Sequence, residues 1–380
     1  MKKLLLAATV ATLAMNAAQA APTLYGKLSV TLDNIDNNDF KDESVVKVNS
    51  NASRLGVKGE EKLTDNLSAV YLAEWEIWAD GDGDAFKNRN RFVGIKSNGV
   101  ATLKVGQYDS YFKTAAGNNQ DIFNDHNELD MTKVLVGEDR LTNVIGFETD
   151  KKLLGGLAFN IMFQQGENAA TSATAKTSTT SLAGVTKETT VVTNYGLKDA
   201  RDGFGDGVSA SLTYENKDMG LAAAVAANRA IASKFNAYSD LTGIYTDAVR
   251  VTGSLDLGAM GASGLVLGAL WQTAQPTDDT VTVTKGTPAV VTSYKGLQED
   301  AFGVTAAYKI GATPVKLKAQ YISATTEVDG MKDRQQDLYG VGADYQINKQ
   351  ARFYGIVAQQ KRDWLTKDDK KTNIGLGMEY

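Results

Sequence analysis

Apolar and polar residues alternate with a period of two along most of the chain. In GVSASLTYE (207–215) the even-numbered positions are apolar or aromatic and the odd-numbered ones are small or polar, and PVKLKAQY (314–321) has the same pattern. This alternation is typical of β-strands with one apolar and one polar face. We predict 16 strands of roughly 8–12 residues, near 23–33, 53–61, 66–77, 88–97, 100–107, 140–150, 155–165, 207–216, 219–228, 247–257, 263–273, 300–310, 314–325, 336–346, 350–360 and 371–380.

The segments that connect these strands are alternately short and long. The short turns include 61–66, 97–99, 216–218, 311–314 and 347–350. The long loops lie near 34–52, 78–87, 108–139, 166–206, 229–246, 274–299, 326–335 and 361–370. In an antiparallel sheet that runs up and down, all short turns then lie at one end, together with both termini of the sheet.

The apolar faces of so many strands cannot all be buried against each other in a soluble sandwich. Closing the sheet removes its edges, directs the apolar side chains to lipid and directs the polar ones to the interior, as in outer-membrane barrels. The sequence therefore predicts an all-β fold, a transmembrane antiparallel up-and-down β-barrel of 16 strands. A barrel of this size encloses an aqueous channel.

The first twenty residues have the pattern of a secretory signal peptide. Lys2 and Lys3 precede an apolar stretch from Leu4 to Met15, and Ala18-Gln19-Ala20 is a small-residue cleavage site. The apolar stretch is too short to cross a bilayer as a helix. We expect cleavage of residues 1–20, and a single barrel domain over 21–380.

Composition excludes several kinds of chemistry. The formal net charge is −5, and −7 without Lys2 and Lys3, so nucleic acid is not an expected partner. There is no cysteine, and His126 is the only histidine. DGDGDAFKNRNR (80–91) resembles the start of a calcium loop, but Ala85 replaces the required glycine and Arg91 the bidentate glutamate. We expect no catalytic residues, no metal and no cofactor.

Two segments rich in Thr, Ala, Ser and Val stand apart from the alternating strands. They are 168–194 and 273–293. Such composition predicts solvated surface loops, which can include a protruding hairpin.

Several stretches together resemble a known family. These are TLYGKLSV (23–30), SRLGVKGEEKL (53–63), NRNRFVGIKSNGVATLKVGQYDS (88–110), RLTNVIGFET (140–149) and the terminal GLGMEY. In their order and spacing they resemble the strands of Gram-negative general (diffusion) porins of the trimeric, 16-stranded class. The middle of the chain fits that class by its alternation alone.

The resemblance implies that the third long loop, 108–139, folds into the lumen and narrows it. Its acidic side chains would face a column of basic ones on the opposite wall. The family's basic positions correspond here to Lys27, Arg54, Arg89 and Arg140. The candidates on the acidic side, by position only, are Asp121, Asp125, Glu128 and Asp130, because the acidic motif of the enteric members is absent.

Alternation gives independent predictions for some of these side chains. It directs Lys27 and Arg54 into the lumen, and Arg140 opposite Leu141. Arg89 shares a face with apolar residues, so its direction stays open. The same rule adds further lumen-facing residues, which are Lys58, Glu74 and Glu76.

In the last strand, alternation directs Ile374, Leu376, Met378 and Tyr380 to lipid and predicts pairing with 23–30, which closes the barrel. The resemblance implies that the terminal aromatic residue, Tyr380, is the signal read by the outer-membrane assembly machinery. That machinery and outer-membrane lipid or lipopolysaccharide are expected partners, and we expect a homotrimer.

The expected function is passive diffusion of small hydrophilic solutes and ions through a channel in the outer membrane of a Gram-negative bacterium. A substrate-specific channel is one alternative, although the basic residues at 250, 316, 318 and 352 scatter around the barrel. A barrel enzyme would have to rely on His126 alone. An adhesin or receptor would act through the long loops.

Overall fold

The computed structural model describes residues 22–380 apart from 84–85, 170, 181–185, 279 and 286–289. The expected signal peptide, 1–20, therefore lies outside the described residues. Among the residues described, no helix is long and apolar enough to cross a membrane.

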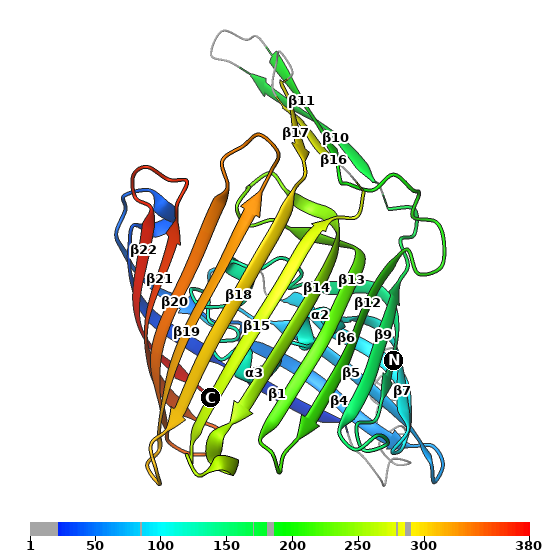
Figure 1. The fold of residues 1–380 in the computed structure, drawn as a ribbon, viewed down its shortest axis with the longest axis vertical. Helices are drawn as coiled ribbons and strands as arrows, with labels where there is room; N and C mark the ends of the chain where they lie inside the picture. The colour runs from blue at the N-terminus through cyan, green and yellow to red at the C-terminus, as the bar shows by residue number, and fades with distance from the viewer. Residues whose placement is uncertain (1–21, 84–85, 170, 181–185, 279, 286–289) are drawn as a thin grey trace, which may run out of the picture.

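One antiparallel sheet contains most of the chain (Figure 1). Its 18 strands are β1 (Thr23–Lys27), β2 (Ser29–Asp36), β3 (Val45–Ser50), β4 (Arg54–Lys62), β5 (Leu67–Glu76), β6 (Lys87–Ser97), β7 (Ala101–Asp109), β8 (Arg140–Thr149), β9 (Leu157–Gln164), β12 (Gly207–Asn216), β13 (Leu221–Lys234), β14 (Thr242–Asp256), β15 (Leu265–Pro276), β18 (Gln298–Lys309), β19 (Val315–Glu327), β20 (Arg334–Gln346), β21 (Arg352–Arg362) and β22 (Lys370–Glu379). Neighbouring strands pair along the chain, except that β1 pairs with β4 and β2 with β3. Most predicted boundaries differ from these by a few residues, but β3 lies inside 34–52, which was predicted as a long loop.

The sheet closes through its first strand. β1 and β2 are two parts of one strand interrupted at Leu28, and β3 and β4 are likewise parts of the second, so the eighteen strands make a wall of sixteen. β2 pairs with β3 on one side and with β22 on the other, from Ser29 opposite Glu379 to Asp36 opposite Thr372. The terminal strand thus closes the barrel as predicted, but its main partner is 29–36 and little of 23–30.

The two faces of the wall differ as the alternation predicts. On β22, Ile374, Leu376 and Met378 are 48–69% exposed, whereas Asn373, directly before Ile374, is 1% exposed. On β12, Leu212 is exposed and Ser211 is buried. The apolar side chains face outward and the polar ones face the interior.

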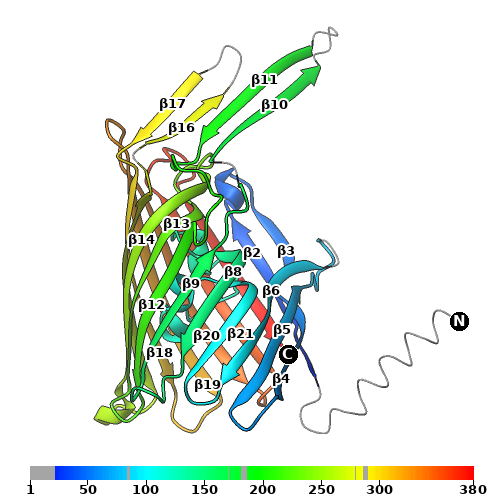
Figure 2. The same cartoon turned by 90° about the vertical axis from the view of Figure 1, so that its right-hand side faces the viewer.

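Two hairpins rise beyond the long-loop end of the wall and form a second sheet (Figures 1 and 2). They consist of β10 (Ser172–Thr180) with β11 (Thr186–Asn194), and β16 (Thr280–Lys285) with β17 (Val290–Lys295). β11 pairs with β16, from Val192 opposite Thr284. The low-complexity segments are therefore paired strands, which their many β-branched residues favour.

Short helices account for the other regular elements. η1 (Asn38–Phe40) lies in the first long loop and η3 (Leu257–Met260) in a turn at the opposite end. α2 (Tyr111–Thr114), α3 (Gly117–Gln120) and η2 (Met131–Lys133) all lie between β7 and β8. That segment, 110–139, is called the inner loop below, because it lies inside the barrel (Figure 1).

Candidate functional site

Side chains of the wall hold the inner loop by its backbone. On three neighbouring strands a glutamine side chain donates a hydrogen bond to a carbonyl oxygen of the loop. They are Gln320 to Leu129 at 2.8 Å, Gln336 to Lys133 at 2.7 Å and Gln360 to Glu128 at 3.2 Å. Since these strands follow one another around the barrel, the middle of the loop is fixed to one side of the lumen.

A buried arginine holds the two ends of the inner loop. Arg250 of β14 is 0% exposed and forms an ion pair with Glu138 near the end of the loop. Its guanidinium also donates to the carbonyl of Phe112, near the start of the loop, and to Gln272. A buried ion pair stays stable only when its remaining donors and acceptors are satisfied, and here the loop backbone accepts one of them.

Asp139 lies at the point where the inner loop joins β8. Its carboxylate accepts a hydrogen bond from the Ser233 hydroxyl. Burial raises the pKa of Asp139 to about 6, although the bond from Ser233 acts in the opposite direction. The carboxyl therefore takes up a proton at a pH well above that of an exposed aspartate.

Asp125, at the tip of the inner loop, meets the predicted basic column. Its carboxylate lies 3.0 Å from Lys27 Nζ, 2.5 Å from Arg54 Nη2 and 3.6 Å from Arg89 Nη2. Burial by itself would raise the pKa of Asp125, but the charges of Arg54, Lys27 and Arg89 together lower it. The charges that the resemblance places on opposite sides of the lumen are in direct contact at this point.

Carboxylates of β5 extend this cluster on the wall. Glu74 accepts a hydrogen bond from Arg89 Nε at 2.7 Å and one from the Tyr25 hydroxyl at 2.7 Å. Glu76 lies 3.8 Å from Arg89 Nη1. Lys58, on the same face of β4 as Arg54, lies with its Nζ 5.0 Å from the centre of the Tyr25 ring. The predicted lumen residues of these strands thus form a network of alternating charge.

A β-bulge explains why the direction of Arg89 stayed open in the sequence. Ala73 pairs with Arg91, but Trp75 pairs with Asn88, so β6 has one residue more than β5 here. The extra residue reverses the alternation. Arg89 therefore contacts the interior carboxylates although Arg91 shares the outer face of Val93.

A second bulge affects Arg140. Gly106 pairs with Val144, but Tyr108 pairs with Leu141, so β8 has one residue more than β7 here. Leu141 is 3% exposed and packs inside against Tyr108, so the predicted outward direction of Leu141 is wrong. Arg140 pairs with Asp109 at 3.1 Å and donates to Asn90 at 2.6 Å. Among the described residues it forms no ion pair with an acidic side chain of the loop tip.

The other three acidic candidates serve different contacts. Glu128 forms an ion pair of 2.6 Å with Lys371 of β22. Asp130 caps η2 by accepting from the backbone N–H of Thr132 at 2.8 Å. Asp121 accepts from the Asn124 side chain, and burial, followed by the charge of Asp130, raises its pKa. Of the four, only Asp125 contacts the basic column within the described structure.

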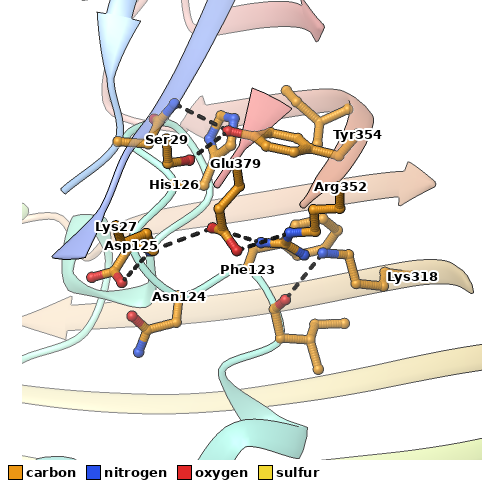
Figure 3. Close-up of a pocket in the computed structure, with 13 residues that line it drawn as sticks. Lys27, Ser29, Phe123, Asn124, Asp125, His126, Lys318, Arg352, Tyr354 and Glu379 are labelled. Carbon is orange, nitrogen blue, oxygen red and sulfur yellow. Dashed lines mark hydrogen bonds and ion pairs between the residues drawn. The ribbon is translucent and has the colours of Figure 1, made fainter. Parts of the chain in front are cut away.

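A small cavity of about 30 Å³ beside Asp125 brings in charged residues of β19, β21 and β22 (Figure 3). Glu379 lies 3.4 Å from Lys27 and 3.0 Å from Arg352. Lys318 lies 3.1 Å from Asp344, and its Nζ donates to a loop carbonyl. Asp344 and Lys371, which pair with Lys318 and Glu128, were not among the predicted lumen residues. Alternation along β22 places Lys371 on the inner face with Asn373, so the sequence contained a signal for it.

The only histidine lies in this region without a catalytic arrangement. His126 Nδ1 accepts from the backbone N–H of Glu128 at 3.2 Å, and its ring lies edge-on to that of Tyr354. Its Nε2 is buried and has no hydrogen-bond partner among the described residues. Burial lowers the pKa of His126.

Comparison with known sequences identifies relatives of the same kind. The sequence model of the family described as Gram-negative porin matches residues 6–364. Major outer membrane protein P.IB of Neisseria meningitidis serogroup B is 31% identical over 176 residues, which is 44% of this chain and 51% of the relative. The protein of the same name from Neisseria gonorrhoeae is 33% identical over 124 residues, or 31% of this chain and 35% of the relative. The match thus spans about half the length of the curated relatives.

Solved structures share the fold across nearly the whole chain. The anion-selective porin from Comamonas acidovorans has a TM-score of 0.63 at 17% identity, over 95% of this chain and 99% of that one. Salmonella typhi OmpF in complex with daunomycin gives 0.59 at 14% identity, over 94% and 97%. The trimer form of Vibrio cholerae OmpT gives 0.55 at 16% identity, over 95% and 99%. At these identities the likeness concerns the fold alone.

Proposed function

Because this chain belongs to the Gram-negative porin family, we propose that it forms a water-filled channel in the outer membrane. Small hydrophilic solutes and ions diffuse through it passively, and no bond is made or broken. The observation that carries this proposal is a closed wall with polar side chains inside and a charged loop fixed across its lumen. A closed wall satisfies its backbone hydrogen bonds in lipid, and a polar interior keeps the path wet.

The inner loop acts as the constriction of this channel. Lys27, Arg54 and Arg89 line one side, with Asp125 bound among them. Charged side chains at a narrowing select permeants by size and by electrostatic field. Three cations share this one loop carboxylate, and Glu74 and Glu76 on the wall balance the two remaining positive charges.

Arg140 lies on the same wall beside this contact, and its charge is paired with Asp109. Asp121, Glu128 and Asp130 act on the shape and attachment of the loop. In this division Asp125 is the only one of the four loop carboxylates that tunes the field at the narrowing directly.

A homotrimer in outer-membrane lipid is the proposed assembly. The support is family membership and the solved neighbour described as a trimer form. Band positions of unheated and heated samples in detergent gels, together with cross-linking, test it. A single band at the monomer mass under both conditions would contradict it.

Conductance in a planar lipid bilayer tests the channel itself. The purified full chain should give stepwise, long-lived current increases that scale linearly with potassium chloride concentration. A heat-denatured sample in the same detergent is the control. Absence of steps from a sample whose circular dichroism shows intact β-structure would contradict the proposal.

A further inference from the structure

A second charged region lies above the inner loop, at the long-loop end of the lumen. It is a hollow of about 410 Å³. Four cationic side chains from four separate segments line it: Lys133 of the inner loop, Lys234 of β13, Arg362 of β21 and Lys371 of β22. We call these four residues the basic hollow.

Negative charge balances the basic hollow only in part. One carboxylate, Asp39, lines it, and Glu128 forms an ion pair of 2.6 Å with Lys371. Lys133, Lys234 and Arg362 form no ion pair with any described residue. Asp130 also acts electrostatically on Lys133, so four positive charges face three negative ones and a surplus of one remains. Like charges gathered in a concave site raise the local concentration of counter-ions.

The guanidinium of Arg362 is held in place, but its hydrogen-bond donors are not all satisfied. It lies over the ring of Phe40, with 4.3 Å between the guanidinium carbon and the ring centre. Its Nε is buried and has no hydrogen-bond partner among the described residues. A buried donor without a partner is costly, and a stacked guanidinium presents its remaining N–H groups as a planar fork that suits an oxyanion.

The first long loop supplies Phe40 in an unusual conformation. Phe40 has φ 58°, and its neighbour Asp39 has φ 53°. A bulky residue with positive φ is strained and persists only when its surroundings fix it. In this conformation the ring of Phe40 also lies 5.9 Å from Lys371 Nζ. The two cations that line one side of the hollow thus share one aromatic support.

We propose that the basic hollow binds small oxyanions that carry two negative charges, with phosphate and short dicarboxylates as the class. Lys133, Lys234 and Arg362, which form no ion pair with a described residue, leave three cations for such a ligand. Arg362 supplies the directional hydrogen bonds. A bound anion there lies next to the inner loop, so it is concentrated before it reaches the constriction. This inference rests on the channel function proposed above.

The experiment is conductance of the purified full chain in planar bilayers, with potassium phosphate added on the long-loop side. Conductance should saturate with phosphate concentration and should rise linearly with potassium chloride. In a variant with Lys234→Gln and Arg362→Gln, the half-saturating phosphate concentration should rise by about tenfold or more, as expected for lost charged hydrogen bonds. Potassium succinate should behave like phosphate, and potassium acetate should saturate weakly.

A matched control removes the same charge elsewhere on the loops. Lys295→Gln with Lys332→Gln changes two lysines that are 76% and 77% exposed in their side chains and lie outside the hollow. Half-saturation should stay within about twofold of the unmodified chain, because exposed charges act weakly at a distance. An equal shift in this control would overturn the site in favour of a general charge effect.

The remaining outcomes distinguish a failure of the basic hollow from a failure of the channel function. Linear phosphate conductance in a chain that conducts potassium chloride would overturn the basic hollow as a site and leave the channel function intact. No conductance in any salt would instead contradict the channel function. Equal saturation by acetate and succinate would overturn the preference for two charges.

Discussion

The barrel wall and the inner loop are stabilised by different kinds of interaction. In the wall, each strand pairs with its neighbours through backbone hydrogen bonds that do not depend on which side chain stands at a position. In the loop, two short helices and a 3-10 turn alternate with irregular backbone, and side chains of the wall supply the missing hydrogen bonds. Loss of one interior side chain of the wall therefore leaves the strand pairing intact, but it removes an attachment of the loop.

Because of this difference, we expect the stability of the barrel and the permeation of ions to respond to different substitutions. Changes at loop contacts should alter conductance and selectivity and leave unfolding of the barrel nearly unchanged. The following predictions test that separation, from the largest expected effect to the smallest.

Arg250→Gln should have the largest effect. It leaves Glu138 buried without its partner, and breaking a buried ion pair in this way costs about 3–5 kcal/mol. Both ends of the loop lose their attachment, so single-channel conductance should rise and become noisy. The thermal unfolding of the barrel in detergent should barely change.

The double variant with Arg250→Gln and Glu138→Gln is the control. It removes both charges together, so conductance should return toward that of the unmodified chain. A large fall in the unfolding temperature of the single variant would show that wall and loop are not separable.

Asp125→Asn should have the next largest effect, on selectivity. It removes the carboxylate shared by Lys27, Arg54 and Arg89. Each such pair is worth about 1 kcal/mol in water and about 4 kcal/mol at an effective dielectric constant of 20. The reversal potential across a potassium chloride gradient should shift toward anion preference.

Asp121→Asn is the matched control on the same loop. Asp121 forms no ion pair with a described residue, and its pKa is raised. The reversal potential should hardly move. If both variants shifted it equally, Asp125 would have no special role at the narrowing.

Proton uptake by Asp139 should change the attachment of the loop between pH 4 and pH 7. Its pKa of about 6 in the folded protein exceeds the ordinary value of 3.8. The added stability is therefore complete below 3.8 and is lost as the pH rises through about 6. Hydrogen exchange at residues 134–139, corrected for intrinsic rates, should be slower at the lower pH.

Asp139→Asn should abolish that pH dependence, because the amide does not titrate. Asp130→Asn should preserve it. Persistence of the dependence in the Asp139 variant would assign it to another group.

Gln336→Ala should have the smallest effect. It removes one of three glutamine bonds to the loop, and a single hydrogen bond contributes about 0.5–1.5 kcal/mol. Hydrogen exchange near Lys133 should accelerate modestly without a change in conductance. Gln335→Ala, next to it on β20, is the control, because Gln335 bonds to Ser323 and Asp337 and not to the loop. Equal acceleration in both would exclude a specific anchor.

The sequence predicted the wall almost completely and the site in part. Alternation located the strands and the inward direction of Lys27 and Arg54, because one face of each strand meets lipid and the other water. It failed at Leu141, where a bulge inserts one residue into β8. A bulge depends on how two strands fit together, and the alternation of either strand alone does not reveal it.

The tip of the inner loop also shows what the sequence pattern does not predict. Four carboxylates within ten residues were candidates, and only Asp125 contacts the basic column. The others contact a lysine, cap a turn or lie buried beside another carboxylate. Which carboxylate reaches the wall depends on the path of an irregular segment, and that path follows from contacts with strands far away in the sequence.

By itself, the sequence determined the closed sixteen-stranded wall and its two faces, because a period of two is a local property that each strand repeats. Only the tertiary structure determined the Asp125 contact, the Arg250 anchor and the basic hollow. Each of these joins residues from three or more separate segments. Their proximity arises only when the barrel closes and the loop packs inside it.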